Sequence, residues 1–385
     1  MKILFASSSS GSRGGGETYL VYLGGALAEL GHEVGLWVST HPRMDETAER
    51  FAKIGKVVRS DYPNTYDRRA RSLGAWLDRR TARMAAEEWA CGRPDVIHIN
   101  KQNLEDGLDL IRGASISRLP TVCTIHLTQT AQYLGAHLAK LRDAVARRAL
   151  GSYRGVLVAV LEERRRELEE FVGTGVRTLA IRNGVPSFPL REREELRAKT
   201  RAVLGIADGK LLVIGVGRLV PQKRPLLFLE RAEALRARLP EAKFLWIGDG
   251  PLANEWDERV RARGLEGSVR RAGWQSDVTP FLAAADLLLH VAAYEGLPLA
   301  ILEAMSAGVP CAVSENLRAE MLFLNDGNSF TVPEHNDTWG DELREPGVIT
   351  LKGAAARTLV ESEFSYSRMA GEYEALYRQV TIARG

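Results

Sequence analysis

Two carboxylates, Glu295 and Glu303, lie in one segment of the sequence at a spacing of eight residues. Proline suits the first turn of a helix, so we expect a helix that begins at Pro298 and ends near Gly308. Glu295 would lie in the preceding loop, and Glu303 would lie inside the helix among apolar residues. An ionised carboxylate accepts hydrogen bonds from two adjacent hydroxyls, which suits a ribose or a hexose. A helical glutamate that faces solvent is the alternative for Glu303.

The junction between this loop and the predicted helix consists of Gly296, Leu297, Pro298 and Leu299. Main-chain amides at 297–299 would point outward at the start of the helix, where the partial positive charge favours anions. The segment therefore predicts an anion site beside two carboxylates that could hold hydroxyls.

Two cations, Arg218 and Lys223, follow Gly217 between a predicted strand and a predicted helix. Arginine offers a planar fork of donors and lysine a point charge, so the pair could clamp a diphosphate. Both charges would also offset the negative charge that develops as a nucleoside diphosphate departs. A solvated basic turn is the alternative, and the pair alone would favour it.

A glycine-rich turn, Gly11-Ser12-Arg13-Gly14-Gly15-Gly16, lies between the first predicted strand and a helix. Backbone without side chains that leads into a helix N-terminus suits a phosphate, although packing explains such turns about as often. A dinucleotide site would need an acidic residue at the end of the second strand to hold the ribose. That strand ends Val38-Ser39-Thr40, so a dinucleotide site is disfavoured.

Short apolar runs alternate with longer helical patterns along the chain, which indicates βαβ units and mostly parallel sheets. In the first half we expect strands at 2–7, 33–39, 95–99, 121–126, 156–160 and 178–181, and a first helix at 17–30. In the second half we expect strands at 211–216, 243–247, 268–272, 287–291 and 310–313. A final helix at 367–380 would carry Met369, Tyr373, Leu376 and Tyr377 on one apolar stripe.

A chain of 385 residues is too long for a single domain with one hydrophobic core, because domains run to about 100–200 residues. The segment 186–209 has two prolines and a charged stretch and is the best candidate for a linker. We expect a Rossmann-like α/β domain over 1–187, a second over 188–365, and a C-terminal helix over 366–385 that returns to the first domain. Open parallel sheets bind ligands beyond the carboxyl ends of their strands, so two facing sheets would place a site in the cleft between them.

Composition excludes several classes of function. The 52 Lys and Arg against 49 Asp and Glu give a net charge of +3, too small to indicate a nucleic-acid partner. Cys91, Cys123 and Cys311 are too few and too far apart for a disulfide framework or a zinc site, which fits a reducing cytoplasm. Neither a signal peptide nor an apolar stretch of about 18 residues occurs, so we expect a cytoplasmic protein that does not span a membrane.

Two basic segments lie in the expected first domain, at 68–83 and 140–154. The first carries Leu73, Trp76 and Leu77 at helical spacing. Either segment could attract an anionic acceptor or a membrane surface. We favour amphipathic helices whose apolar stripes enter the core while their arginines face water.

Taken in chain order, several motifs resemble the retaining family-4 glycosyltransferases, and the resemblance covers about residues 1–333. The segment that carries Glu295 and Glu303 is the most specific of them. The full set is Gly14-Gly15-Gly16-Glu17, Asp95-Val96-Ile97-His98, Arg182-Asn183-Gly184-Val185, Val216-Gly217-Arg218 with Lys223, Ile247-Gly248-Asp249-Gly250, Gly273-Trp274 and the two glutamates.

The resemblance implies a GT-B fold, in which two Rossmann-like domains face each other across a cleft. The second domain would hold the nucleotide sugar, and the first would supply most of the acceptor surface. Arg218 and Lys223 would bind the diphosphate, Glu303 the ribose, and Glu295 the transferred sugar. The remaining donor-site residues would be Gly15, Gly16, Gly217, Gly248, Gly296, Leu297, Pro298 and Leu299.

The resemblance also implies that His126, at the end of a first-domain strand, faces the donor sugar. Without the resemblance, a lone histidine in that place would more often be structural. The family reaction is a front-side displacement that retains anomeric configuration, with a UDP- or GDP-sugar as donor and a hydroxyl as acceptor. No Asp-x-Asp motif occurs in the sequence, so we expect no metal and no other cofactor.

Two other functions stay open. A sugar-nucleotide epimerase on the same fold would need no acceptor. A non-catalytic nucleotide-sugar-binding protein is the other, because the segment 314–320 lacks the glycines usual in the family.

Overall fold

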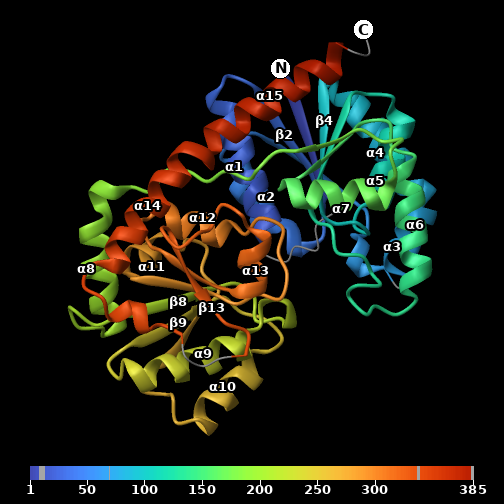
Figure 1. The fold of residues 1–385 in the computed structure, drawn as a ribbon. Coiled ribbons are helices and arrows are strands. Elements are labelled where there is room, and N and C mark those ends of the chain that lie inside the picture. The colour runs from blue at the N-terminus through green and yellow to red at the C-terminus, as the bar shows by residue number, and fades with distance from the viewer. Residues whose placement is uncertain (8–13, 69, 336–338, 383–385) are drawn as a thin grey trace. The chain divides into compact units, whose positions relative to one another are not determined.

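The computed structural model describes residues 1–7, 14–68, 70–335 and 339–382, and the chain forms two compact units. Unit 1 consists of Met1–Gly184 and Tyr366–Gly385, and unit 2 consists of Val185–Ser365. Each unit is an α/β structure with its own parallel sheet (Figure 1).

In the described part of unit 1, seven parallel strands form one sheet in the order β3-β2-β1-β4-β5-β6-β7. The strands are β1 (Lys2–Ser7), β2 (Glu33–Ser39), β3 (Lys56–Ser60), β4 (Val96–Asn103), β5 (Thr121–Leu127), β6 (Val156–Ala159) and β7 (Thr178–Ala180). The helices are α1 (Gly15–Glu29), η1 (Pro42–Met44), α2 (Asp45–Ala52), η2 (Thr65–Asp67), α3 (Arg71–Leu77), α4 (Arg79–Gly92), α5 (Leu108–Ser117), α6 (Ala139–Gly151), α7 (Glu162–Val172) and α15 (Tyr366–Ile382).

Side chains alternate along β4 and β5 between two buried faces, as expected for central strands covered by helices on both sides. Ile97 and Ile99 of β4 lie in one core with Trp89 of α4 and Ile111 of α5. The even-numbered residues of β4, among them His98, lie on the other face of the sheet, toward α1 and α15.

Helix α15 is held to unit 1 by a buried polar network as well as by its apolar stripe. His98 shares hydrogen bonds with the Tyr377 hydroxyl and, at 2.8 Å, with Oγ1 of Thr124. The same Oγ1 lies 2.7 Å from the Tyr373 hydroxyl. Burial, together with the nearby His126, lowers the pKa of His98 to about 3, so the ring is neutral at physiological pH. The predicted stripe is confirmed, and Met369 is fully buried with the tyrosines.

In unit 2, six parallel strands among the described residues follow the order β10-β9-β8-β11-β12-β13. The strands are β8 (Leu212–Val216), β9 (Lys243–Ile247), β10 (Val269–Gly273), β11 (Leu287–His290), β12 (Cys311–Ser314) and β13 (Ser329–Val332). The helices are η3 (Leu190–Glu192), α8 (Arg193–Leu204), η4 (Pro221–Lys223), α9 (Pro225–Arg238), α10 (Ala253–Ala262), α11 (Thr279–Ala284), α12 (Leu299–Ser306), α13 (Glu315–Glu320), η5 (Asp341–Arg344) and α14 (Val348–Glu363).

The segment 186–209 is not a linker along its length, because α8 occupies its middle. Arg197 and Arg201, one helical turn apart, both bind the Asp286 carboxylate and donate to the main-chain carbonyl of Ala284 at the end of α11. The carboxylate also accepts the amide of Leu212 at the start of β8. The charged pattern that suggested a linker therefore fastens this helix to unit 2.

The two basic segments are helical, as predicted, but not every apolar side chain in them is buried. The first forms α3 and α4, and Leu77 between them is 73% exposed. Trp76 is covered by Arg112, whose Cζ lies 4.2 Å from the ring centroid. None of the helices in the described residues has the length and hydropathy needed to cross a bilayer.

Candidate functional site

In unit 2 the predicted site residues lie in the loops that leave β8 and β11. These two strands are neighbours in a parallel sheet, so the loops after them emerge at the same edge. Gly217 and Arg218 follow β8, Lys223 ends the short helix η4, and Glu295 lies in the loop after β11. The topology therefore brings together residues that are about 70 positions apart in the sequence.

Gln222 fastens the two loops to each other. Its main-chain carbonyl accepts the amide of Ala293 at 2.8 Å, and its side-chain amide donates to the carbonyl of Tyr294 at 3.1 Å. These bonds flank Lys223 on one loop and Glu295 on the other, so the relative position of the two charges is fixed by main-chain contacts.

Glu295 is an ionised carboxylate in a buried place, with 5% of its surface exposed. Its Oε1 forms an ion pair with Nζ of Lys223 and lies 3.1 Å from Nε2 of His290. Burial alone would raise the pKa of Glu295, but the Lys223 charge and the hydrogen bonds from His290 and Lys223 lower it to about 2. The other oxygen, Oε2, has no partner among the described residues and stays an acceptor.

Arg218 is half-buried and makes neither a hydrogen bond nor an ion pair with the described residues. The Lys223 ammonium has three N–H donors, and Glu295 takes one of them. This edge of unit 2 therefore keeps unused cationic donors beside an unused carboxylate oxygen, an arrangement that suits an anion carrying hydroxyl groups.

Gly217 and Gly248 lie where the loops after β8 and β9 approach each other closely. The amide of Gly217 donates to Ile247 at 3.0 Å, and that of Gly248 donates to Gly273 at 2.8 Å. A Cβ atom on Gly248 would lie 2.0 Å from the carbonyl oxygen of Gly217, and its φ of +137° favours glycine. Packing of these loops explains Gly248 without reference to a ligand.

Helix α12 starts one residue later than predicted, with Pro298 as the residue before its first turn. Proline has no amide hydrogen, so the predicted row of amides at 297–299 is interrupted at its centre. Gly296, Leu297 and Leu299 are buried, and Glu303 lies within the helix at intermediate exposure, as predicted. The neighbouring Leu302 packs into the core.

In unit 1, Gly16 and His126 are joined through Asn100, a residue that the sequence analysis did not select. The Asn100 side-chain amide donates to the carbonyl of Gly16 at 3.3 Å, and its Oδ1 lies 2.8 Å from Nε2 of His126. A Cβ on Gly16 would lie 2.2 Å from the amide end of the Gln102 side chain, so Gln102 would have to move to admit it, whereas Gly15 beside it is exposed. Gly11–Arg13 of the predicted turn lie outside the described residues.

His126 is a neutral imidazole held in one tautomer. Burial lowers its pKa to about 4, and its ring stacks edge-on against Tyr19 at 4.7 Å between centroids. Asn100 uses its Nδ2 as a donor to Gly16, so its Oδ1 accepts, and Nε2 of His126 must carry the proton. Asn100 could have been selected from the sequence, because it lies in the second half of β4, the strand that pairs with the strand of His126.

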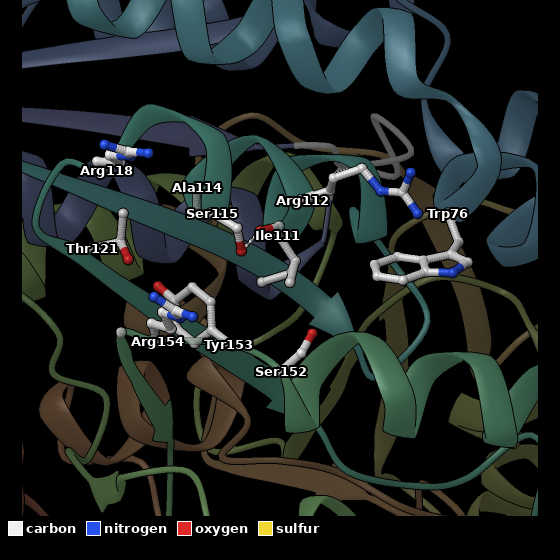
Figure 2. Close-up of a pocket in the computed structure, with 11 residues that line it drawn as sticks. Trp76, Ile111, Arg112, Ala114, Ser115, Arg118, Thr121, Ser152, Tyr153 and Arg154 are labelled. Carbon is white, nitrogen blue, oxygen red and sulfur yellow. Dashed lines mark hydrogen bonds between the residues drawn. The ribbon is translucent and has the colours of Figure 1, made fainter.

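A pocket of about 870 Å³ lies in unit 1 at the opposite end of β5 from His126. Thr121 begins the strand and lines the pocket, whereas His126 is near its end. Figure 2 shows Arg118 and Arg154 on either side of Thr121, and Arg112 beside Trp76. None of the predicted site residues lines it.

The structure therefore yields two groups of predicted site residues. Unit 2 brings Arg218, Lys223 and Glu295 together with the glycines of the neighbouring loops, and unit 1 brings His126 to Gly16 through Asn100. The described residues contain no cluster of three or more His, Cys, Asp or Glu side chains suited to a metal ion. Metal independence and the roles of the individual residues stay predictions.

The two parallel sheets with alternating helices define a GT-B type of fold, and comparison with known families agrees. The model of "Glycosyltransferase Family 4" matches residues 13–187, and that of "Glycosyl transferases group 1" matches residues 197–343. The chain belongs to the family-4 type of glycosyltransferases, which confirms the resemblance read from the motifs.

Two curated relatives match parts of the chain. The UDP-Gal:alpha-D-GlcNAc-diphosphoundecaprenol alpha-1,3-galactosyltransferase of Escherichia coli is 34% identical over 152 residues, 39% of this chain and 38% of the relative. The alpha-D-kanosaminyltransferase of Streptomyces kanamyceticus is 26% identical over 203 residues, 51% of this chain and 52% of the relative. The matched segments thus span between about a third and a half of these relatives.

Solved structures match over nearly the whole chain and confirm the expected fold class. The sucrose-phosphate synthase of Thermosynechococcus elongatus superposes with a TM-score of 0.79 at 19% identity and covers 100% of both chains. HepE of Anabaena, solved in complex with UDP and glucose, superposes with a TM-score of 0.78 at 20% identity and covers 97% of this chain and 98% of its own.

Proposed function

We propose that this chain is a retaining glycosyltransferase that transfers a hexose from a nucleotide-diphosphate sugar to a hydroxyl acceptor. The observation that carries the proposal is the edge of unit 2 where Arg218 and Lys223 keep free donors and Glu295 keeps a free oxygen. A nucleotide sugar has both complementary parts, a diphosphate and a ring of hydroxyls. Membership of the glycosyltransferase family supports the same reaction class.

In the proposed reaction the bond between the sugar C1 and the diphosphate oxygen breaks, and a bond from the acceptor oxygen to C1 forms on the same face. The acceptor proton passes to the departing phosphate oxygen, so no protein nucleophile is needed. Arg218 and Lys223 offset the charge that develops on the leaving group. Glu295 is ionised at neutral pH, so it accepts hydrogen bonds from the sugar and cannot act as an acid.

A UDP-sugar is the first donor to test. HepE was solved with UDP and with UDP-glucose, and the name of the E. coli relative specifies UDP-Gal. Ligands that bind only the native state raise its stability by RT ln(1 + [L]/Kd), so a thermal-shift screen of UDP- and GDP-sugars identifies the donor. Release of nucleoside diphosphate with a panel of acceptors, and the anomeric proton coupling of the product by NMR, then test transfer and retention.

Variants test the donor contacts, and their stability is measured alongside because Lys223 also pairs with the buried Glu295. We expect Lys223→Ala and Glu303→Ala each to weaken donor use by about 2 kcal/mol or more. Lys210→Ala is the matched control, because Lys210 pairs with exposed Glu241 away from the loops of the site. Conversion of the donor without acceptor would instead identify an epimerase, and donor binding without turnover on any acceptor would identify a binding protein.

A further inference from the structure

A segment of unit 1 that the proposed reaction does not use exposes an unusual amount of apolar surface. It comprises the loop after β5 and the first turn of α6, residues 128–141. Tyr133, Leu134, Leu138 and Leu141 are exposed by 65%, 41%, 56% and 51%. Single exposed apolar residues are ordinary, but four within nine positions indicate a contact surface.

This segment is ordered by its own polar contacts. The carboxylate of Asp143 accepts the amides of Ala131 and Gln132 at 2.7 and 3.0 Å. Arg142 binds Glu105 through two hydrogen bonds of 2.7 Å. The leucines are therefore presented by a fixed backbone, and Leu138 even adopts a left-handed conformation with φ of +54°.

The charges around the apolar residues are almost all positive. Lys140, Arg147 and Arg148 of α6 are exposed, and Arg154 follows the helix. Between residues 128 and 154 the acidic side chain is Asp143, which is buried. Arg142 is paired with Glu105, whereas Lys140, Arg147 and Arg148 form no ion pair with the described residues. Helix α6, drawn in green in Figure 1, therefore carries exposed positive charge that no acidic side chain in the described part of the chain offsets.

We propose that residues 132–148 form a docking surface for an anionic lipid membrane. Leu134, Leu138 and Leu141 would enter the boundary between headgroups and acyl chains, and Lys140 and Arg148 would contact the phosphates. Apolar burial and attraction to anionic lipids act together in peripheral binding, and this surface supplies both. The loop leaves β5 directly after His126 and Leu127, so the membrane would lie at the carboxyl edge of the unit 1 sheet.

The test is flotation of the purified full chain with vesicles of phosphatidylcholine, with and without phosphatidylglycerol. We expect binding to the anionic vesicles, weakened by added salt because exposed charges are screened. Leu138→Asn with Leu141→Gln should weaken binding about tenfold or more, since two leucines no longer enter the lipid. Asparagine tolerates the left-handed conformation at 138, so the fold is kept.

A charge variant and a control variant complete the experiment. Lys140→Glu with Arg148→Glu should also lower binding about tenfold or more, and should flatten its salt dependence. Val203→Asn with Leu351→Gln alters equally exposed apolar residues of unit 2, at 81% and 71%, and should leave binding unchanged. The experiment uses neither donor nor acceptor, so its result is independent of the proposed transfer.

Three results would overturn the membrane surface. The first is a wild-type chain that does not float with anionic vesicles, and the second is undiminished binding by the Leu138/Leu141 variant. The third is a wild-type chain that does not bind vesicles but forms a dimer, seen by light scattering, which the Leu138/Leu141 variant abolishes. The surface would then bind a second copy of the chain.

Discussion

The ion pair between Lys223 and Glu295 offers a quantitative check on the site. A carboxyl pKa lowered from 4.5 to about 2 corresponds to roughly 3 kcal/mol of stability at neutral pH. Both side chains are well covered, at 18% and 7% exposure, so solvent screening removes little of this. Lys223→Met or Glu295→Gln alone leaves the partner charge buried without compensation, and we expect each to lower the free energy of unfolding by about 3 kcal/mol.

The double variant Lys223→Met/Glu295→Gln removes both charges and should be no less stable than either single variant. Urea unfolding at pH 7, followed by the fluorescence of the buried Trp246 and Trp256, measures all four proteins. The cycle should give a coupling of about 3 kcal/mol. Because the folded pKa is the lower one, the coupling is complete above pH 4.5 and is lost as pH falls toward 2. Single effects that add to within about 0.5 kcal/mol would refute a buried ion pair here.

Three further predictions concern other parts of the site. Burial lowers the pKa of His126 to about 4, so its ring should stay neutral at pH 6 in an NMR titration. The contribution of His126 should make the free energy of unfolding rise with pH between about 4 and 6.5. A ring that titrates at about 6.5 contradicts both expectations. Gly248→Ala should lower the free energy of unfolding by about 1–3 kcal/mol because its Cβ meets the Gly217 carbonyl, whereas Gly267→Ala, with open space around it, is the control that should change little. Donor use should be unaffected by excess EDTA, and a loss restored by added magnesium would show that the prediction of metal independence is wrong.

The sequence predicted most of the strands and the class of fold, because central parallel strands are continuous apolar runs between helical patterns. Both strands that it missed, β3 and β13, lie at sheet edges, and Lys56–Ser60 contains two valines among polar residues. Helix α8 was read as a linker, because its arginines reveal their role only once Asp286 lies beside them. Leu77 was placed in the core by spacing alone, and the break between α3 and α4 exposes it.

The candidate site was predicted unevenly for a similar reason. Charged residues in glycine-containing loops after strands could be selected from the sequence, and they include Arg218, Lys223 and Glu295. Their partners could not. Gln222 reaches Tyr294 only because β8 and β11 are neighbours in the sheet, and His290 reaches Glu295 only because the loop after β11 folds back on the end of its strand. Asn100 is likewise an unremarkable strand residue until β4 and β5 lie side by side.

Helix α15 has a consequence for synthesis of the chain. His98 and Thr124 are made early, but the tyrosine hydroxyls that they bind in α15 follow unit 2 in the chain. Unit 2 is complete before those residues are translated, since it ends at Ser365. Unit 1 therefore completes the hydrogen bonds of His98 only after unit 2 has been translated. A chain that stops before Tyr377 leaves Nδ1 of His98 without its partner and would be a target for quality control even though unit 2 is intact.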